Sequence, residues 1–202
     1  MDLALFDFDG TITDTEMYTP FVKHTTSLSR RVMTSPILIP ALVLYKLKLL
    51  PARKMRPLVS FLAFVGKRRN KIENDGQYFV KSVISKHLRE IALERIKWHQ
   101  ARGDRVVVVS ASLDAYLTPW SRTLGVELLC SELSGANRLS GLYRHGDVSC
   151  ETKALLVQGL CDLSAYHSIY AYGDTDEDSA LLTLATHQYL NWELVNESFN
   201  KE

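Results

Sequence analysis

Acidic residues follow two predicted strands that lie far apart in the chain. Asp7 and Asp9 come directly after an apolar run, in the stretch DFDGT, and Asp174 and Asp178 belong to the stretch GDTDED. The carboxyl ends of parallel strands form the ligand crevice of an open sheet, so we expect these four side chains to meet. Four carboxylates in one crevice repel one another unless a cation lies among them. Because oxygen ligands favour hard cations, the sequence predicts a Mg²⁺ site.

Two further polar residues are expected at the same edge of the sheet. Ser110 lies near the end of the stretch RVVVVSAS, whose four consecutive valines predict a strand that is buried on both faces. Lys153 lies near the start of a predicted helix and could add a fixed positive charge. The sequence has no Gly-rich phosphate loop of the Walker or dinucleotide-binding type, and Ser110 lacks the G-x-S-x-G setting of a hydrolase nucleophile.

Strands and helices alternate along most of the chain. Strands are predicted at residues 3–8, 105–112, 126–131, 168–174 and 186–192. Helices are predicted between them at residues 114–124, 151–161 and 176–185. The glycines of residues 134–148 predict a small hairpin excursion. This alternation indicates an α/β fold with a parallel sheet.

Residues 15–85 do not alternate in this way. They are mostly helical in pattern and are punctuated by prolines, so we interpret them as an inserted helical subdomain. The core would then consist of residues 1–14 and 86–202. Residues 16–97 carry a net charge of +12 and the rest of the chain −11, which leaves the overall charge of +1. This separation predicts either two regions with different partners or an ordinary solvated basic surface.

The apolar run PILIPALVLYKLKLLP, at residues 36–51, allows two interpretations. It is shorter than the roughly 20 residues that a membrane-spanning helix needs, and Lys46 and Lys48 interrupt it. It could form a helix buried in the subdomain or a helix that lies in the membrane interface. The second interpretation is favoured by nearby basic residues, which are Arg53, Lys54, Arg56, Lys67, Arg68 and Arg69.

The composition is that of an ordinary globular protein. Of the 202 residues, 46% are apolar and 23% are charged, and the three cysteines have no metal-ligand spacing. The first residues lack the basic region of a signal peptide, so we expect a cytoplasmic chain with reduced thiols. The basic residues lack interleaved aromatic side chains and recognised motifs, so no nucleic-acid partner is expected.

The order and spacing of the motifs resemble those of a known enzyme family. The stretch DFDGT, the strand-terminal Ser110, Lys153 and the stretch GDTDED are similar to the four signature motifs of the haloacid dehalogenase (HAD) superfamily of phosphohydrolases. The helical insertion resembles the C1 cap of subfamily IB, which contains phosphoserine phosphatase. The basic, apolar cap also resembles that of the phosphatidylglycerophosphatase C-like branch. The resemblance implies a three-layer, Rossmann-like core with an inserted all-helical cap.

The resemblance also implies a catalytic role for each motif. Asp7 would be the nucleophile that forms an aspartyl-phosphate, and Asp9 would be the general acid and then the general base. Their spacing suits these roles, because residues two apart in a strand point to the same side. Ser110 and Lys153 would hold the phosphoryl oxygens as the charge on the phosphoryl group shifts during the reaction.

The same resemblance implies how the metal is bound. Mg²⁺ would contact Asp7, the backbone carbonyl of Asp9, and Asp174, and would offset the repulsion between nucleophile and phosphate. Asp178 would orient a metal-bound water or the motif lysine. Thr11 is expected to form a hydrogen bond that holds the turn after the first strand and to be one of the residues that bind the substrate.

Residues beside the motifs bear on the substrate. In phosphoserine phosphatases, an acid at the offset of Glu16 contacts the substrate amino group. Those enzymes usually carry Ser-Gly-Gly where this chain has Ser-Ala-Ser, and the side chain of Ala111 would narrow the phosphate pocket. Arg53 and Arg56 could pair with a carboxylate or a second phosphate of the substrate, or could remain solvated on the cap.

We therefore predict a Mg²⁺-dependent phosphomonoesterase that acts on a small-molecule or lipid-linked phosphate monoester. The alternative hypothesis is a basic membrane-surface or anion-binding module in which the phosphatase site is secondary. It is motivated by the charge of residues 16–97 and by the apolar run at residues 36–51. Peripheral contact with the inner face of an anionic membrane is compatible with both hypotheses.

Overall fold

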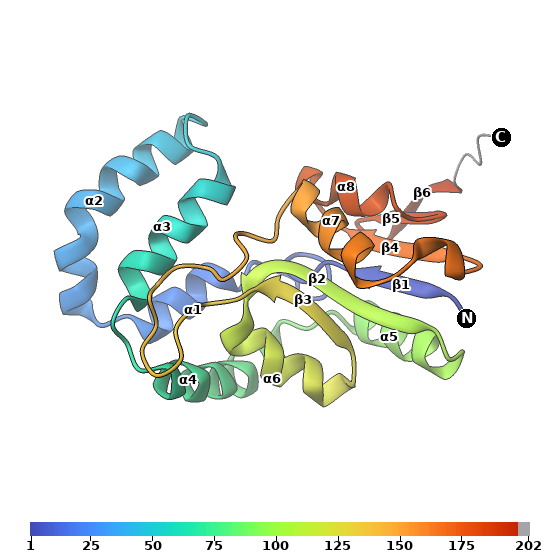
Figure 1. The fold of residues 1–202 in the computed structure, drawn as a ribbon, viewed down its shortest axis with the longest axis horizontal. Helices are drawn as coiled ribbons and strands as arrows, with labels where there is room; N and C mark the ends of the chain where they lie inside the picture. Colours follow the sequence, from blue (N-terminus) through green and yellow to red (C-terminus); the bar gives the residue numbers. More distant parts are fainter. Residues whose placement is uncertain (198–202) are drawn as a thin grey trace.

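A six-stranded sheet organises residues 1–197, the part of the chain that the computed structural model describes. The strands run in the order β3-β2-β1-β4-β5-β6 (Figure 1). The first five are parallel to one another, and β6 pairs antiparallel with β5. The strands are β1 (Leu3–Phe6), β2 (Arg105–Leu113), β3 (Glu127–Ser131), β4 (Ile169–Gly173), β5 (His187–Leu190) and β6 (Glu193–Glu197).

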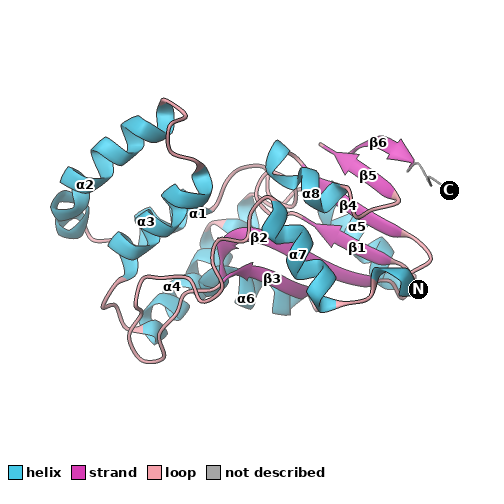
Figure 2. Cartoon of the chain, turned by 45° about the horizontal axis from the view of Figure 1, so that its top comes forward, coloured by secondary structure: helices cyan, strands magenta, loops and turns pink. Residues whose placement is uncertain are grey.

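Helices cover both faces of this sheet. Helices α5 (Glu90–Ala101) and α6 (Asp114–Leu124) lie against one face, and α7 (Glu151–Leu160) and α8 (Ser179–Leu182) lie against the other (Figures 1 and 2). The predicted α/β fold, with three layers and a parallel sheet, is thus confirmed. The five predicted strands are present, and β6 is an addition that the sequence did not indicate.

The central strand shows why this part of the sequence is apolar without alternation. Successive side chains of a strand point to opposite faces of the sheet. Ala4 and Phe6 join the core cluster on the side of α5 and α6, whereas Leu3 and Leu5 join the cluster on the side of α7 and α8. All four side chains are fully buried. A strand with a helical layer on each side therefore needs an apolar residue at every position.

The helix predicted at residues 176–185 is shorter than expected. A 3₁₀ turn at Asp176–Asp178 precedes α8, which has only four residues. The amide of Ala185 bonds to a carbonyl three residues back (3.0 Å), and the amide of Thr186 already bonds to Ile169 of β4 (2.8 Å). The helix ends early because the chain enters the next strand at this point.

The excursion predicted at residues 134–148 is a loop rather than a regular hairpin. One isolated antiparallel bridge joins Leu133 and Tyr143, and the residues between them form bends, with a second isolated bridge from Arg138 to Arg68. The loop is attached to the helical insertion, because the amide of Gly66 donates to the carbonyl of Leu139 (2.9 Å). It therefore connects the sheet with the insertion.

Five α-helices lie between β1 and β2, and the four that precede α5 fall within residues 15–85, where the helical pattern predicts helices. These four are α1 (Tyr18–Thr25), α2 (Leu28–Lys46), α3 (Ala52–Phe64) and α4 (Arg69–Ser82). Helices α2 and α3 form an arm that projects from the rest of the molecule, whereas α4 packs alongside α6 (Figures 1 and 2). The division between core and cap at residues 14 and 85 stays a prediction, since α4 shares its packing surface with a helix of the core.

Helix α2 is apolar but largely uncovered, which contradicts the interpretation of residues 36–51 as a buried helix. Only Ala41 is buried among its residues, because α3 covers one side of the helix alone. Its exposed apolar side chains are Leu28, Val32, Met33, Ile37, Ile39, Leu42, Val43, Leu44 and Tyr45. Within residues 1–197, no helix combines the length and the hydropathy needed to cross a membrane.

Gly76 allows α4 to approach α6 closely. A Cβ atom at this position would lie 1.9 Å from the carbonyl oxygen of Ala115. Alanine usually stabilises a helix relative to glycine by roughly 0.5–1 kcal/mol. Here the overlap with backbone dominates, so we expect Gly76→Ala to lower the free energy of unfolding by about 1–2 kcal/mol. Urea denaturation monitored by circular dichroism measures this change.

Gly159 supplies the matched control. It also lies in a helix, α7, but a Cβ atom there would meet no atom within 4 Å. Gly159→Ala is therefore expected to leave the stability unchanged or to raise it by up to about 1 kcal/mol. Equal effects of the two substitutions would show that close packing between α4 and α6 is not what Gly76 provides.

Candidate active site

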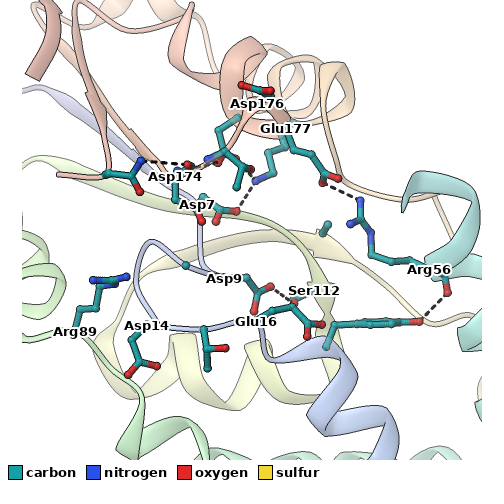
Figure 3. Close-up of a pocket in the computed structure, with 18 residues that line it drawn as sticks. Asp7, Asp9, Asp14, Glu16, Arg56, Arg89, Ser112, Asp174, Asp176 and Glu177 are labelled. Carbon is teal, nitrogen blue, oxygen red and sulfur yellow. Dashed lines mark hydrogen bonds and ion pairs between the residues drawn. The ribbon is translucent and has the colours of Figure 1, made fainter. Parts of the chain in front are cut away.

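The carboxyl ends of β1, β2 and β4 meet at one edge of the sheet, because these three strands are neighbours. A cavity of about 540 Å³ opens at this edge, and residues of α1 and α3 contribute to its far wall. Its lining includes Asp7, Asp9, Glu16, Tyr18, Arg56, Arg89, Ala111, Ser112, Lys153, Asp174, Asp178 and Asn191 (Figure 3). The predicted convergence of acids from both ends of the chain is therefore present.

Three carboxylates form a cluster at the base of the cavity. Asp7, Asp174 and Asp178 each offer an oxygen, and these oxygens lie within 4.8 Å of one another. The ammonium of Lys153 contacts both Asp7 and Asp178, with a distance of 2.5 Å from Nζ to Oδ1 of Asp178. Lys153 is only 3% exposed. One buried cation thus faces three acids, which leaves an excess of negative charge.

Burial changes the proton affinity of this cluster. It raises the pKa of Asp7 well above its ordinary value, because Lys153 opposes the effect only in part and Asp178 adds to it. The pKa of Asp174 is raised to about 6, first by burial and then by the charge of Asp178. Burial alone would lower the pKa of Lys153, but Asp7 and Asp178 raise it. A further cation would favour the ionised form of both shifted acids.

Asp9 lies beside the cluster and has its own hydrogen-bond partners. Its Oδ1 accepts from the amide of Met17 (2.7 Å), and its Oδ2 accepts from the hydroxyl of Ser112. Burial raises the pKa of Asp9 to about 6, against the opposing effect of these two hydrogen bonds. Its carboxylate is not part of the three-acid cluster. The metal contact of Asp9 that the motif resemblance implies is made by its backbone carbonyl, which is compatible with a carboxylate outside the cluster.

The turn after β1 brings the backbone against the cluster. Gly10 has a φ of +82°, and a Cβ atom there would lie 2.0 Å from Oδ2 of Asp174. The turn is held by backbone hydrogen bonds, including one from the amide of Ile12 to the carbonyl of Phe8 (2.9 Å). The prediction that Thr11 forms a hydrogen bond in this turn is wrong, because its buried hydroxyl has no partner among residues 1–197.

The end of β2 presents Ala111 and Ser112 to the cavity, whereas Ser110 is not one of the residues that line it. Ser110 is fully buried, and its hydroxyl accepts a hydrogen bond from the amide of Ser112 (3.0 Å). Ser110 is thus next to the cavity without being part of its wall. Ala111 lines the cavity, where its side chain occupies space as expected.

The two predicted arginines have different positions. Arg56 of α3 lines the cavity and forms ion pairs with Asp147 (2.8 Å) and Glu177 (3.0 Å). Arg53 is exposed and does not line the cavity, so the structure does not bring it to the site. Arg53 lies in the first turn of α3, almost one helical turn before Arg56. Glu16 does line the cavity, and its carboxylate accepts from the amide of Thr19 (2.6 Å).

Several residues of the cavity were not found from the sequence. Tyr18 donates from its hydroxyl to the carbonyl of Arg56 (2.7 Å), and Arg89 and Asn191 also line the wall. None of them lies in a signature motif. Ser112 lies two residues after a motif serine, so a closer look at the stretch SAS could have indicated it.

Comparison with protein families gives a match over most of the chain. The model for haloacid dehalogenase-like hydrolases matches residues 4–183. A curated relative, protein CicA of Caulobacter vibrioides (strain NA1000 / CB15N), is 29% identical over 193 residues. This alignment covers 91% of the chain and 82% of the relative.

Solved structures with the same fold include two informative examples. A protein of unknown function from Bordetella pertussis Tohama I has a TM-score of 0.76 and 21% identity, over 93% of this chain and 88% of that one. A substrate-bound phosphoserine phosphatase has a TM-score of 0.63 and 18% identity, over 92% of this chain and 83% of that one. At these identities, the similarity establishes the shared fold.

Proposed function

Because the chain belongs to the haloacid dehalogenase-like hydrolase family, we propose that it is a Mg²⁺-dependent phosphomonoesterase. The observation that carries this proposal is the cluster of Asp7, Asp174 and Asp178 around Lys153, with Asp9 beside it. The phosphoserine phosphatase of the same fold supports a phosphate ester as the substrate. The resemblance of the four motifs to the HAD superfamily is confirmed by the family match.

The residues present fit a magnesium ion. All three donors of the cluster are carboxylates, which Mg²⁺ prefers, and their oxygens lie within 4.8 Å of one another. The excess negative charge and the raised pKa of Asp7 and Asp174 both favour an additional cation. Asp7, Asp174 and the backbone carbonyl of Asp9 would hold the ion, with Asp178 behind them. When bound, Mg²⁺ would neutralise charge on the phosphoryl group.

The residues of the chain divide the reaction into two displacements. A carboxylate oxygen of Asp7 attacks phosphorus, and the bond from phosphorus to the leaving oxygen breaks. Asp9 gives its proton to that leaving oxygen. In the second step, Asp9 takes a proton from a water molecule, whose oxygen attacks phosphorus. The bond from phosphorus to the Asp7 oxygen then breaks, which releases inorganic phosphate and restores the Asp7 carboxylate. Asp9 can reach both groups because it lies beside Asp7 and is held in place by two hydrogen bonds.

The other residues of the site contribute binding. Lys153 is fixed beside Asp7 and would hold the phosphoryl oxygens as the new bond forms. Ser110 would hold the end of β2 in place, because its hydroxyl accepts from the amide of Ser112 (3.0 Å), and Ala111 would limit the size of the phosphate pocket. Glu16 and Arg56, on the wall away from the sheet, would contact the rest of the substrate.

Dependence on metal tests this proposal. We expect hydrolysis of p-nitrophenyl phosphate to require Mg²⁺ and to be lost in EDTA. Even a change in an outer partner of a metal ligand typically weakens metal binding about 10- to 100-fold, so Asp174→Asn should raise the Mg²⁺ concentration for half-maximal activity at least about tenfold. Titration of activity with Mg²⁺ measures this shift.

Asp176 provides the control for this titration. It lies in the same loop but is exposed and outside the three-acid cluster. Asp176→Asn should leave the Mg²⁺ dependence close to that of the unmodified protein. Full activity in EDTA, or the same Mg²⁺ dependence in both variants, would contradict a metal site at Asp174.

A second candidate function is contact with an anionic membrane surface, where the substrate would be a lipid-linked phosphate. A second cavity of about 560 Å³ lies among α1, α2 and α3, and it shares Glu16, Tyr18 and Arg56 with the active-site cavity. Most of its other lining residues are apolar. The exposed apolar side chains of α2 lie close in sequence to the exposed cations Lys46 and Lys48. Such a combination favours the interface of an anionic bilayer.

Sedimentation with vesicles tests this second candidate. The protein should bind vesicles that contain anionic lipid, and binding should weaken as the salt concentration rises. Met33→Asp, which places a charge on the most exposed apolar residue of α2 (79%), should reduce binding. Hydrolysis of p-nitrophenyl phosphate should not change, because Met33 lies outside both cavities. No binding to anionic vesicles at low salt would exclude this function.

A further inference from the structure

Two buried hydroxyl groups form a chain of hydrogen bonds that ends at the carboxylate of Asp9. The hydroxyl of Ser112 donates to Oδ2 of Asp9 (Figure 3), and the hydroxyl of Tyr116 donates to Oγ of Ser112 (2.6 Å). The second carboxylate oxygen, Oδ1, accepts from the amide of Met17 (2.7 Å). Ser112 is 1% exposed and Tyr116 is fully buried, so the hydrogen bond between these two hydroxyl groups is shielded from water.

An irregularity in β2 aims Ser112 at Asp9. The pairing of β2 with β3 shifts in register between Ser110 and Leu113, so the residues between them form a bulge. Bulges turn side chains away from the regular alternation of a strand. The amide of Ser112 donates to the hydroxyl of Ser110 (3.0 Å), and this hydrogen bond stabilises the backbone of the bulge. Tyr116 then reaches Ser112 from the first turn of α6, which begins directly after β2.

We propose that Ser112 and Tyr116 are positioning residues that orient the Asp9 carboxyl group and stabilise its ionised form as it protonates the leaving group. This inference rests on the proposed function, in which Asp9 is the general acid. As Asp7 bonds to phosphorus, the bond from phosphorus to the leaving oxygen breaks, and the proton of Asp9 moves to that oxygen. Ser112 and Tyr116 keep their own protons throughout.

The direction of the hydrogen bonds explains the stabilisation. A donor aimed at a carboxylate favours its charged form, and a donor that itself accepts a hydrogen bond is strengthened. Burial raises the pKa of Tyr116 well above its ordinary value, so its hydroxyl stays protonated and can only donate to Ser112 in this arrangement. Ser112 and Tyr116 therefore stabilise the negative charge that Asp9 acquires when its proton moves to the leaving oxygen.

The dependence of the rate on the leaving group tests this assignment. Phenyl phosphate and p-nitrophenyl phosphate differ only in the nitro group, but phenoxide is the stronger base and needs the proton from Asp9 more. A general acid contributes about 10²–10⁴-fold, so we expect Ser112→Ala to lower kcat/KM for phenyl phosphate about tenfold more than for p-nitrophenyl phosphate. The ratio of the two values does not depend on how much of the variant is folded.

Three further variants define the outcome. Tyr116→Phe should change the ratio in the same direction but by less, since Ser112 keeps its bond to Asp9. Ser112→Thr retains the hydroxyl and should restore the ratio. Ser121→Ala removes another buried hydroxyl, which bonds to the carbonyl of Thr118 (3.2 Å) in α6 and lies outside the cavity, and should leave the ratio unchanged.

The result also distinguishes this inference from the proposed function. If Ser112→Ala lowers kcat/KM equally for both substrates while the unmodified protein hydrolyses both, the serine has only a structural role and the inference is wrong. If the unmodified protein hydrolyses neither substrate in the presence of Mg²⁺, the proposed function is overturned, and the inference falls with it.

Discussion

Replacing Asp7 by asparagine is expected to reduce the hydrolysis of p-nitrophenyl phosphate by at least about 10³-fold. The amide keeps the shape of the carboxylate but is a far weaker nucleophile, so the aspartyl-phosphate cannot form at a useful rate. Asp7 lies at the base of the cavity in contact with Lys153, and among residues 1–197 the only other carboxylate that contacts Lys153 is that of Asp178, which is 1% exposed. Initial rates with excess Mg²⁺ measure the effect.

Loss of structure should not account for this result. The fold raises the pKa of Asp7, which means that its ionised form is less favourable in the folded protein than in water. A neutral side chain is therefore not expected to lower the free energy of unfolding. Asp14→Asn, in the same loop and more than half exposed at its side chain (54%), should remain active. Hydrolysis that survives Asp7→Asn unchanged would overturn the role of Asp7 and the proposed mechanism.

Removing the ammonium of Lys153 is expected to have the largest effect on stability. Lys153 contacts Asp7 and Asp178, and all three side chains are at least 93% buried. Breaking a buried ion pair by removal of one partner typically costs about 3–5 kcal/mol, because the remaining charges are left without compensation. We expect Lys153→Met to lower the free energy of unfolding by about this amount at neutral pH, as measured by urea denaturation without metal.

The origin of this loss can be tested in two ways. The deficit should shrink as the pH falls, because Asp7 and Asp174 already have raised pKa values and would take up protons in the folded state before the unfolded state does. The double variant with Asp7→Asn should recover part of the stability, since one uncompensated charge is gone. Lys97→Met, on the exposed side of α5, should change the free energy of unfolding by less than about 0.5 kcal/mol. An effect of Lys153→Met as small as this would contradict a structural ion pair.

The positions of the acids could be predicted because they depend on a simple rule of topology. Apolar runs at residues 3–8 and 168–174 predicted two strands of one parallel sheet, and the acids come directly after them. Once the strands are parallel neighbours, their carboxyl ends must lie at the same edge, so Asp7 and Asp174 meet. Lys153 could be assigned to the same site from its position in the order of the motifs. Here the local pattern was sufficient.

Side-chain orientation could not be predicted in the same way. The bulge of β2 depends on its pairing with β3, and this pairing turns Ser112 toward Asp9. The hydroxyl of Thr11 faces the interior without a partner, although its residue type favours a hydrogen bond in the turn. Arg53 and Arg56 look equivalent in the sequence, yet only Arg56 faces the cavity and finds Asp147 and Glu177 there.

The sequence by itself determined the parallel α/β core, the helical insertion and the acids that meet at the edge of the sheet. These features follow from hydrophobic periodicity and from residues placed at strand ends, both of which are local properties of the chain. Only the tertiary structure decided that α2 leaves its apolar side chains uncovered, that Ser112 and Tyr116 support Asp9, and that Arg53 lies apart from the site. Those outcomes depend on contacts between segments that are distant in the sequence, and no local pattern predicts which segment will pack against which face.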